Sequence, residues 1–290
     1  MKSEYTKIIE SVPQLELEQS KFDKEIASAQ DLINELNYRY FGPNSTGRAT
    51  LGKFGSVIFP FYSFGKVYSY FHFEYRELVL FCIYSSLLKP GIDFLDIGGN
   101  LGLHSIIASK LTKSGIYYFE PDPIHFSEAL KRFTLNKVNT RIKTYRVAIS
   151  NFNGTSEFVS VKDNTTSSHL SNSGKIPYGP LETFTVKVNK IQEFMKPSQK
   201  YLAKIDAEGS EFKILNGVSS GQWDNLNCLV EITSKEIGFE VLNFTKHQNL
   251  KIFSQKISWN EAKSGEDIPH NYKEGSILIT RNLKRSDIFN

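Results

Sequence analysis

Three glycines stand where a short apolar run gives way to a helix. The run 92–97 carries Asp96 near its end, Gly98, Gly99 and Gly102 follow it, and apolar residues then recur at helical spacing. Because glycine has no Cβ, a ligand can approach the backbone closely at such a turn. The free N–H groups at the helix start favour an anionic group such as a carboxylate. The stretch therefore predicts a strand, a turn and a helix that open a nucleotide-binding βαβ unit.

The spacing of these glycines separates two classes of nucleotide ligand. The dinucleotide fingerprint requires Gly-x-Gly-x-x-Gly, but Asn100 stands two positions after Gly98. The pattern Asp96-x-Gly98-x-x-x-Gly102 is instead the form associated with S-adenosylmethionine. About twenty residues beyond the turn, a second apolar run ends at Glu120, whose carboxylate can accept hydrogen bonds from both hydroxyls of a ribose. We therefore expect this part of the chain to bind S-adenosylmethionine.

A second group of charged residues, Lys204, Asp206, Glu208 and Glu211, accompanies a later apolar run. Strand alternation places Lys204 and Asp206 on one face, and Asp206 falls at the carboxyl end of a core strand, where open α/β sheets bind ligands. A base that takes the proton of an acceptor hydroxyl accelerates methyl transfer by about 10²–10⁴-fold. Asp206 and Glu208 are the candidates, and Lys204 either pairs with Asp206 or binds acceptor oxygens. Acids also stabilise a helix start without any catalysis, which we prefer for Glu211 and leave open for Glu208.

A metal ion or a histidine could also take part in the chemistry. Asp206 and Glu231 fall at neighbouring strand ends and could chelate Mg²⁺, although the sequence assigns no metal ligand. His104 lies one turn into the helix that follows the glycine turn, and it is interpreted as a packed or cofactor-adjacent residue. His169 and His270 fall in loops and stay open as bases.

The remaining elements must position these two groups. Residues 1–40 predict two helices broken near Pro13, and 41–53 predict a loop. The aromatic stretch 54–75 predicts a hairpin turning at 63–66, which we expect to pack on the helices in preference to stacking on an acceptor. Strands are expected at 142–149, at 156–161 and at 186–188, the last continuing the main sheet. The polar loop 162–182 is interpreted as a lid over the acceptor.

Composition limits the classes of protein that remain. The 290 residues, 40% hydrophobic and 23% charged, fit one large α/β domain with a smaller addition. The net charge of +4 is spread along the chain, so we expect no nucleic-acid partner. Cys82 and Cys228 both lie in apolar runs and suggest buried reduced thiols. The polar N-terminus and the lack of a long apolar helix predict no signal peptide, no transmembrane segment and a cytoplasmic location.

The chain resembles the FkbM family of S-adenosylmethionine-dependent methyltransferases over roughly residues 74–281. Three stretches carry the likeness: Phe94-Leu-Asp-Ile-Gly-Gly-Asn-Leu-Gly-Leu-His104, Phe119-Glu-Pro-Asp-Pro123 and Lys204-Ile-Asp-Ala-Glu-Gly-Ser-Glu211. The resemblance implies a Rossmann-like seven-stranded class I methyltransferase sheet with helices on both faces, preceded here by a helical and β-hairpin extension. It divides the chain into an extension, 1–73, and a methyltransferase domain, 74–290.

The resemblance also assigns residues and an activity. It implies cofactor contacts from Asp96, Gly98, Gly99, Asn100, Gly102, Glu120 and Asp122, and a catalytic signature of Lys204, Asp206 and Glu208. The activity implied is O-methylation of a sugar, a glycan or another small hydroxylated metabolite. Family members often carry Leu-Asp before the fourth strand, where this chain reads Ile191-Gln192, so rate or acceptor choice could differ here.

Two other functions stay open. An RNA methyltransferase would share the cofactor fold, but the chain lacks a Pro-Pro-Tyr motif and a cysteine nucleophile after the fourth strand, and its basic charge is diffuse. A catalytically silent binding protein would keep the fold and recognise a partner through the aromatic stretch, but the carboxylates of both motifs are intact. The sequence predicts no oligomeric state.

Overall fold

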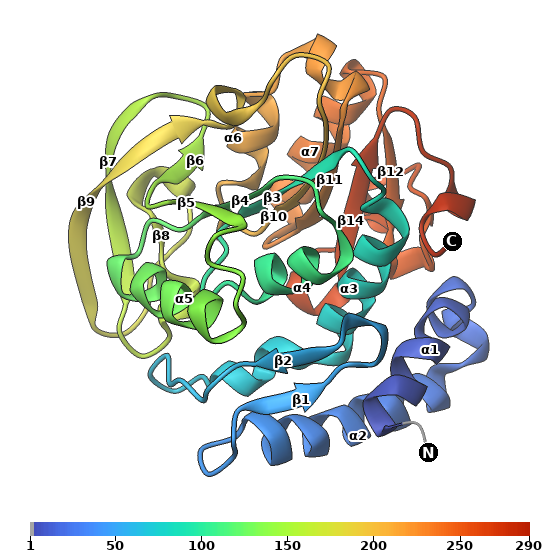
Figure 1. The fold of residues 1–290 in the computed structure, drawn as a ribbon. Helices are drawn as coiled ribbons and strands as arrows, with labels where there is room; N and C mark the ends of the chain where they lie inside the picture. Colours follow the sequence, from blue (N-terminus) through green and yellow to red (C-terminus); the bar gives the residue numbers. More distant parts are fainter. Residues whose placement is uncertain (1–2) are drawn as a thin grey trace.

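A twisted sheet forms the centre of the computed structural model, which describes residues 3–290 (Figure 1). Its strand order is β13-β12-β14-β11-β10-β3-β4-β5. The strands from β5 to β11 run parallel, whereas β14 runs antiparallel to both of its neighbours. The strands are β3 (Ile92–Ile97), β4 (Ile116–Phe119), β5 (Ile142–Tyr145), β10 (Lys200–Ile205), β11 (Leu226–Glu231), β12 (Lys251–Ser254), β13 (Asn260–Glu261) and β14 (Ser276–Thr280). The predicted seven strands are present, and two-residue β13 adds an eighth at the edge.

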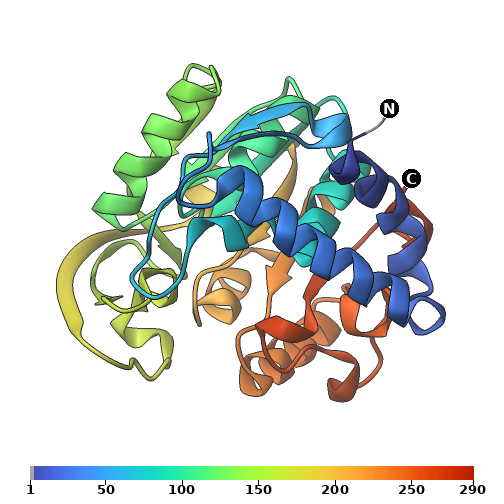
Figure 2. The same cartoon turned by 90° about the horizontal axis from the view of Figure 1, so that it is seen from below.

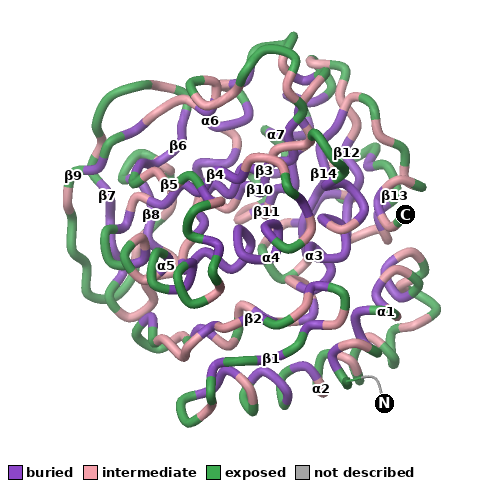
Figure 3. The backbone as a smooth tube through the Cα atoms, in the orientation of Figure 1, coloured by how far each residue is buried: buried purple, intermediate pink, exposed green. Residues whose placement is uncertain are grey.

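Helices cover both faces of this sheet, as predicted. One hydrophobic core joins one face of the sheet to α3 (Tyr75–Leu87), α4 (Leu103–Leu111) and α5 (Pro123–Leu135). A second core joins the other face to α6 (Glu211–Asn216) and α7 (Lys235–His247). The central strands are buried along most of their length because both faces are covered (Figure 3). Cys82 and Cys228 are buried and unpaired.

The N-terminal extension shares the first core. Its helices are α1 (Glu4–Leu17) and α2 (Asp23–Phe41), and apolar residues of both pack with those of α3. Figures 1 and 2 both place α1 beside the C-terminal segment. Glu16 accepts hydrogen bonds from Trp259 Nε1 at 2.9 Å and Gln255 Nε2 at 3.1 Å, which ties the two ends of the chain together. The domain boundary at residue 73 stays a prediction.

The helix break predicted at Pro13 is wrong, because α1 continues through it. A proline inside a helix leaves the carbonyl four residues earlier without its N–H donor. That carbonyl belongs to Ile9, and the Sγ atom of Cys82 donates to it at 3.7 Å. The thiol therefore supplies a weak replacement, and the chain breaks instead at 18–22, before α2.

The hairpin lies upstream of the predicted position. Its strands are β1 (Arg48–Thr50) and β2 (Ser56–Ile58), which pair antiparallel. At the predicted turn, only the isolated bridge between Ser63 and Tyr68 joins the two flanking runs, and the 3₁₀ helix η3 (Ser69–Phe73) follows. The rings of Phe73 and Phe41 stack with centroids 3.9 Å apart, so packing on α2 anchors this stretch more than strand pairing does.

A second sheet of four strands corrects the prediction for residues 142–190. The expected strand 142–149 is split, and 186–188 does not continue the main sheet. The order is β6-β9-β7-β8, with β6 (Ala148–Ser150), β7 (Gly154–Val161), β8 (His169–Leu170) and β9 (Leu181–Lys190). In β9 exposed and buried residues alternate between 185 and 188, as in a half-solvated antiparallel strand (Figure 3).

None of the helices in the described part of the chain has the length and apolar character needed to cross a bilayer.

Candidate functional site

A cavity of about 650 Å³ lies at the carboxyl ends of the parallel strands. It brings together the two sequence motifs, which lie far apart in the chain. The predicted site residues that line it are Gly98, Gly99, Asn100, Glu120, Lys204, Asp206 and Glu208. Asp96, Gly102 and Asp122 belong to the same turns but are not part of the cavity wall.

Protein neighbours already require each of the three glycines. A Cβ on Gly98 would lie 1.8 Å from the carbonyl oxygen of Asp206, and one on Gly99 would lie 2.4 Å from the Tyr118 ring. A Cβ on Gly102 would lie 2.4 Å from the Phe133 ring. Gly98 and Gly102 also have positive φ angles, of 71° and 80°. The sequence attributed these glycines to a ligand, but close packing against β10 and the ring of Phe133 is sufficient reason for them.

Asp96 holds the turn against the helix that follows. Asp96 is fully buried. Its Oδ2 accepts one hydrogen bond from the backbone N–H of Ser105, at 3.0 Å, and one from the Oγ of Ser105, at 2.6 Å. A carboxylate in this place satisfies a free N–H in the first turn of α4. Direct contact between Asp96 and a cofactor stays a prediction.

Glu120 is positioned by backbone groups from two turns. Its Oε2 accepts from the N–H of Asn100 at 2.9 Å, and its Oε1 accepts from the N–H of Asp122 at 2.8 Å. Burial raises the pKa of Glu120 to about 8. Each carboxyl oxygen has a further lone pair to offer a ligand.

Asp122 works as a helix cap. Its Oδ1 accepts from the N–H groups of Ile124 at 2.8 Å and His125 at 3.1 Å, at the start of α5. The cofactor contact assigned to Asp122 by resemblance stays a prediction.

Lys204 and Asp206 form a buried ion pair at the end of β10, as strand alternation predicts. Lys204 Nζ donates to Asp206 Oδ2 at 2.9 Å. Burial lowers the pKa of Lys204, but the nearby carboxylates of Asp206, Asp96 and Glu77 outweigh burial and raise it above the ordinary value. A protonated ammonium group therefore faces Asp206. The Asp206 side chain is 27% exposed and lines the cavity.

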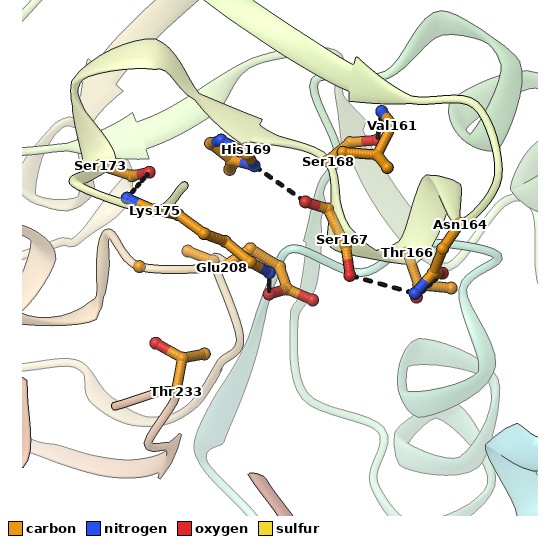
Figure 4. A network of polar contacts seen from close by, with 12 residues as sticks. Val161, Asn164, Thr166, Ser167, Ser168, His169, Ser173, Lys175, Glu208 and Thr233 are labelled. Carbon is orange, nitrogen blue, oxygen red and sulfur yellow. Dashed lines mark hydrogen bonds and ion pairs between the residues drawn. The ribbon is translucent and has the colours of Figure 1, made fainter. Parts of the chain in front are cut away.

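Glu208 reaches toward the polar loop. Its backbone has a φ of 49°, and its carboxylate pairs with Lys175 from the loop 162–182 (Figure 4). Burial raises the pKa of Glu208 to about 7. Glu208 thus connects the second motif to the polar loop 162–182.

Glu211 has a structural position, as preferred from the sequence. It is fully buried and accepts hydrogen bonds from the N–H groups of Ala207, at 2.9 Å, and Gly209, at 3.0 and 3.1 Å. Burial raises the pKa of Glu211 to about 6. Glu231, at the end of β11, lines the cavity, and burial raises its pKa well above the ordinary value.

Residues of the polar loop 162–182, from Asn164 to Tyr178, also line the cavity. Thr165 joins this loop to α5, because its Oγ1 lies 2.9 Å from His125 Nε2. The N–H of Thr165 also donates to Phe64 O at 3.0 Å, which joins the loop to the aromatic stretch. Lys66 Nζ pairs with Asp163 at 2.6 Å (Figure 4 shows the adjoining residues). The loop therefore bridges the aromatic stretch and the two motifs, and its action as a lid stays a prediction.

Sequence reasoning did not bring together Glu77 and His104, which line the part of the cavity that we call its floor, or place Tyr84 against His104. His104 Nδ1 lies 2.8 Å from Tyr84 OH, and its Nε2 lies 3.1 Å from Glu77 Oε2, so both ring nitrogens are occupied. Burial alone would raise the pKa of Glu77, but His104, Lys204 and His72 lower it to about 2. His104 is therefore a packed residue.

His72 also lines this floor. Its Nε2 is buried without a hydrogen-bond partner, and burial lowers its pKa to about 4. The only sequence signal for it was its position in the aromatic stretch.

No metal site is evident between residues 3 and 290, since no group of three or more His, Cys, Asp or Glu side chains is arranged to hold an ion. Of the two carboxylates that the sequence offered to Mg²⁺, that of Asp206 accepts a hydrogen bond from Lys204 Nζ through its Oδ2, at 2.9 Å. Nothing in this arrangement supports the Mg²⁺ alternative.

Comparison with solved structures gives matches of low similarity. The structure of "Methyltransferase FkbM" from Methylobacillus flagellatus is 14% identical with a TM-score of 0.41, covering 68% of this chain and 47% of that one. The precorrin-6y C5,15-methyltransferase of Geobacter metallireducens is 11% identical with a TM-score of 0.40, covering 70% and 86%. The N-terminal domain of human METTL16 in complex with SAH is 14% identical with a TM-score of 0.35, covering 66% and 62%. The chain thus spans about half the length of the M. flagellatus structure, and scores at this level carry no argument about activity.

Comparison with protein sequences is more decisive. No curated protein matches the chain. A family model described as the Methyltransferase FkbM domain matches residues 96–255, which is 160 of the 290 residues and includes both motifs. Because this match covers more than half of the sequence, the chain belongs to the FkbM methyltransferase family.

Proposed function

We propose that this chain is an S-adenosylmethionine-dependent O-methyltransferase that acts on a hydroxyl of a sugar, a glycan or another small metabolite. The observation that carries the proposal is that Glu120, beside the glycine turn, and the Lys204–Asp206 pair line one cavity. A cofactor held by Glu120 and an acceptor held by the Lys204–Asp206 pair would meet in this cavity.

The cofactor side has suitable size and chemistry. About 650 Å³ is within the range of roughly 300–1,000 Å³ usual for ligand pockets. Glu120 would accept the ribose hydroxyls, while the turn 98–100 would approach the rest of the cofactor. Asn100 has a buried Oδ1 without a hydrogen-bond partner, which leaves an acceptor for a ligand N–H or O–H. Asp96, Gly102 and Asp122 would act by holding these turns in place.

The acceptor side would supply the base. S-adenosylmethionine supplies an electrophilic methyl group on a sulfonium sulfur. Asp206 would accept the hydroxyl proton while the acceptor oxygen forms its bond to the methyl carbon and the carbon–sulfur bond breaks, leaving the methyl ether and S-adenosylhomocysteine. Lys204 would orient Asp206 and the acceptor oxygen. Glu208 is the alternative base, and its pairing with Lys175 would fix the position of its carboxylate.

The N-terminal extension would belong to the acceptor side, because Phe59, Val67, Tyr68, Phe71 and His72 line the cavity. We keep the division into 1–73 and 74–290 as a proposal, and we retain from the sequence a cytoplasmic location without a nucleic-acid partner.

Calorimetry and labelled-methyl transfer test the proposal. Wild-type protein should bind S-adenosylhomocysteine, and Glu120→Ala should weaken that binding. In a screen of sugar, glycan and lipid acceptors, Asp206→Asn should lose turnover yet keep cofactor affinity. Asp224→Asn is the matched control, since that carboxylate is 61% exposed and pairs with Arg281 at the surface.

The results separate the alternatives. A wild type without affinity for S-adenosylhomocysteine would reject the proposal. Cofactor binding without transfer to any acceptor would favour the silent binding protein, and undiminished turnover in Asp206→Asn would remove that residue from the mechanism.

A further inference from the structure

Four aromatic side chains stand at the mouth of the cavity. Tyr68, Phe71, Tyr178 and Tyr272 all line it, yet each is between 37% and 53% exposed. Large aromatic rings at a cavity edge that remain open to solvent mark a binding surface more often than a folding requirement. We call these four side chains the aromatic rim.

Ring contacts, a cation–π contact and short stretches of chain link the members of the aromatic rim. The rings of Tyr68 and Phe71 stack at an angle of 25° with centroids 6.4 Å apart. Three residues after Phe71, Glu74 pairs with Arg76, and the Arg76 guanidinium lies 5.6 Å from the centroid of the Tyr272 ring.

The polar loop contributes Tyr178 to the aromatic rim. Asn164 Nδ2 donates to Tyr178 OH at 3.0 Å, and Asn164 forms a bridge with Gly65, three residues before Tyr68. Three separate segments, namely 65–76, 164–178 and the loop around 272, therefore build one edge.

The charges inside the aromatic rim favour a neutral, hydroxyl-rich ligand. Each Lys or Arg that lines the cavity in the described chain is already paired: Arg76 with Glu74, Lys175 with Glu208 and Lys204 with Asp206. No lining cation is therefore left free for a phosphate, which disfavours nucleic acid and anionic lipid headgroups. With Glu120 assigned to the cofactor, the carboxyl of Glu231, which also lines the cavity, can instead exchange hydrogen bonds with acceptor hydroxyl groups.

We propose that the aromatic rim is a carbohydrate subsite, against which a sugar ring of the acceptor lays its apolar C–H face. A pyranose ring presents such a face together with hydroxyls at its edge, which matches aromatic rings outside and carboxylates within. The inference rests on the proposed function and narrows it, because it commits the acceptor to a glycan.

A printed array of neutral oligosaccharides tests the subsite, with the full chain and S-adenosylhomocysteine present. Wild-type protein should retain at least one glycan, and Phe71→Ala and Tyr272→Ala should each lower that binding about tenfold or more, as truncation of a central aromatic contact does. Calorimetric affinity for S-adenosylhomocysteine should not change in either variant, which also shows that they fold. Phe71→Tyr should keep glycan binding.

Tyr38→Ala is the matched control. That tyrosine is 60% exposed and packs edge-on against Tyr70, but it lies outside the cavity wall, so its removal should leave array binding unchanged. A wild type that binds S-adenosylhomocysteine but retains no array glycan would overturn the subsite, as would rim variants that bind like wild type. Retention of single-stranded RNA or anionic vesicles in place of glycans would also overturn it. Loss of S-adenosylhomocysteine binding in the wild type would instead refute the proposed function.

Discussion

Gly98→Ala should both destabilise the protein and displace Asp206. The added Cβ would lie 1.8 Å from Asp206 O, and contacts of this kind are essentially absent below 3.0 Å, so the ends of β3 and β10 must separate by about 1.2 Å. A non-glycine residue at φ 71° costs about 1–2 kcal/mol, and forcing an extra carbon into a packed site costs about 1–3 kcal/mol. We therefore expect the free energy of unfolding to fall by about 2–5 kcal/mol.

Gly174→Ala separates the two causes. Gly174 has a φ of 84° in the left-handed region, and a Cβ there meets nothing within 4 Å, so the substitution adds backbone strain without the clash. Urea unfolding of both variants measures the difference, which should be about 1–3 kcal/mol. In methyl transfer, a displacement of about 1 Å at Asp206 should lower turnover by about 10²-fold. Equal destabilisation by the two substitutions, with Gly98→Ala still active, would refute the inference that this glycine exists for the contact with β10.

Three further results are expected. Burial raises the pKa of Glu120 to about 8, so affinity for S-adenosylhomocysteine should weaken about tenfold for each pH unit below 8 and level off above it. Calorimetry from pH 6 to 9 measures this affinity, and a flat wild-type profile would contradict the prediction. Glu211→Ala removes the acceptor of buried N–H groups and should lower the free energy of unfolding by about 2–4 kcal/mol in urea, with Glu211→Gln less affected. Lys175→Met leaves Glu208 buried without its cation and should speed hydrogen exchange across 162–182, whereas Lys162→Met, which breaks an exposed pair, should not.

The sequence was informative where strands are buried on both faces. The short apolar runs 94–95, before Asp96, and 201–203, before Lys204, lie in strands that helices cover on both faces. The carboxyl ends of such parallel strands lie at one edge of the sheet, where ligands bind. Polar residues that break such a run are therefore placed accurately without any structure. This is why the glycine turn, Glu120 and Asp206 were each predicted to lie at the end of a strand, and the structure brings them to one cavity.

Sequence reasoning was less successful where contacts are long-range. The alternation of Thr183, Phe184, Thr185 and Val186 was a signal for a half-exposed antiparallel strand, and it could have identified the second sheet. The continuation of α1 through Pro13 depends on a thiol 69 residues away, which no local pattern contains. The position of Glu77 and His72 on the cavity floor likewise depends on how the extension packs, and neither residue belongs to a motif.

The eight residues 204–211 show why their charges are not interchangeable. Lys204 and Asp206 lie on one face of β10 and point into the cavity, so they form the part that can touch an acceptor. Glu208 leaves the strand in a left-handed conformation, and that geometry is what lets it reach Lys175. Glu211 turns back and binds the N–H groups of the same turn, which fixes the path of the backbone between the other two. Neutralising each carboxylate in turn should therefore separate three effects, on turnover, on the covering loop and on stability, although all three acids lie within six positions of one another.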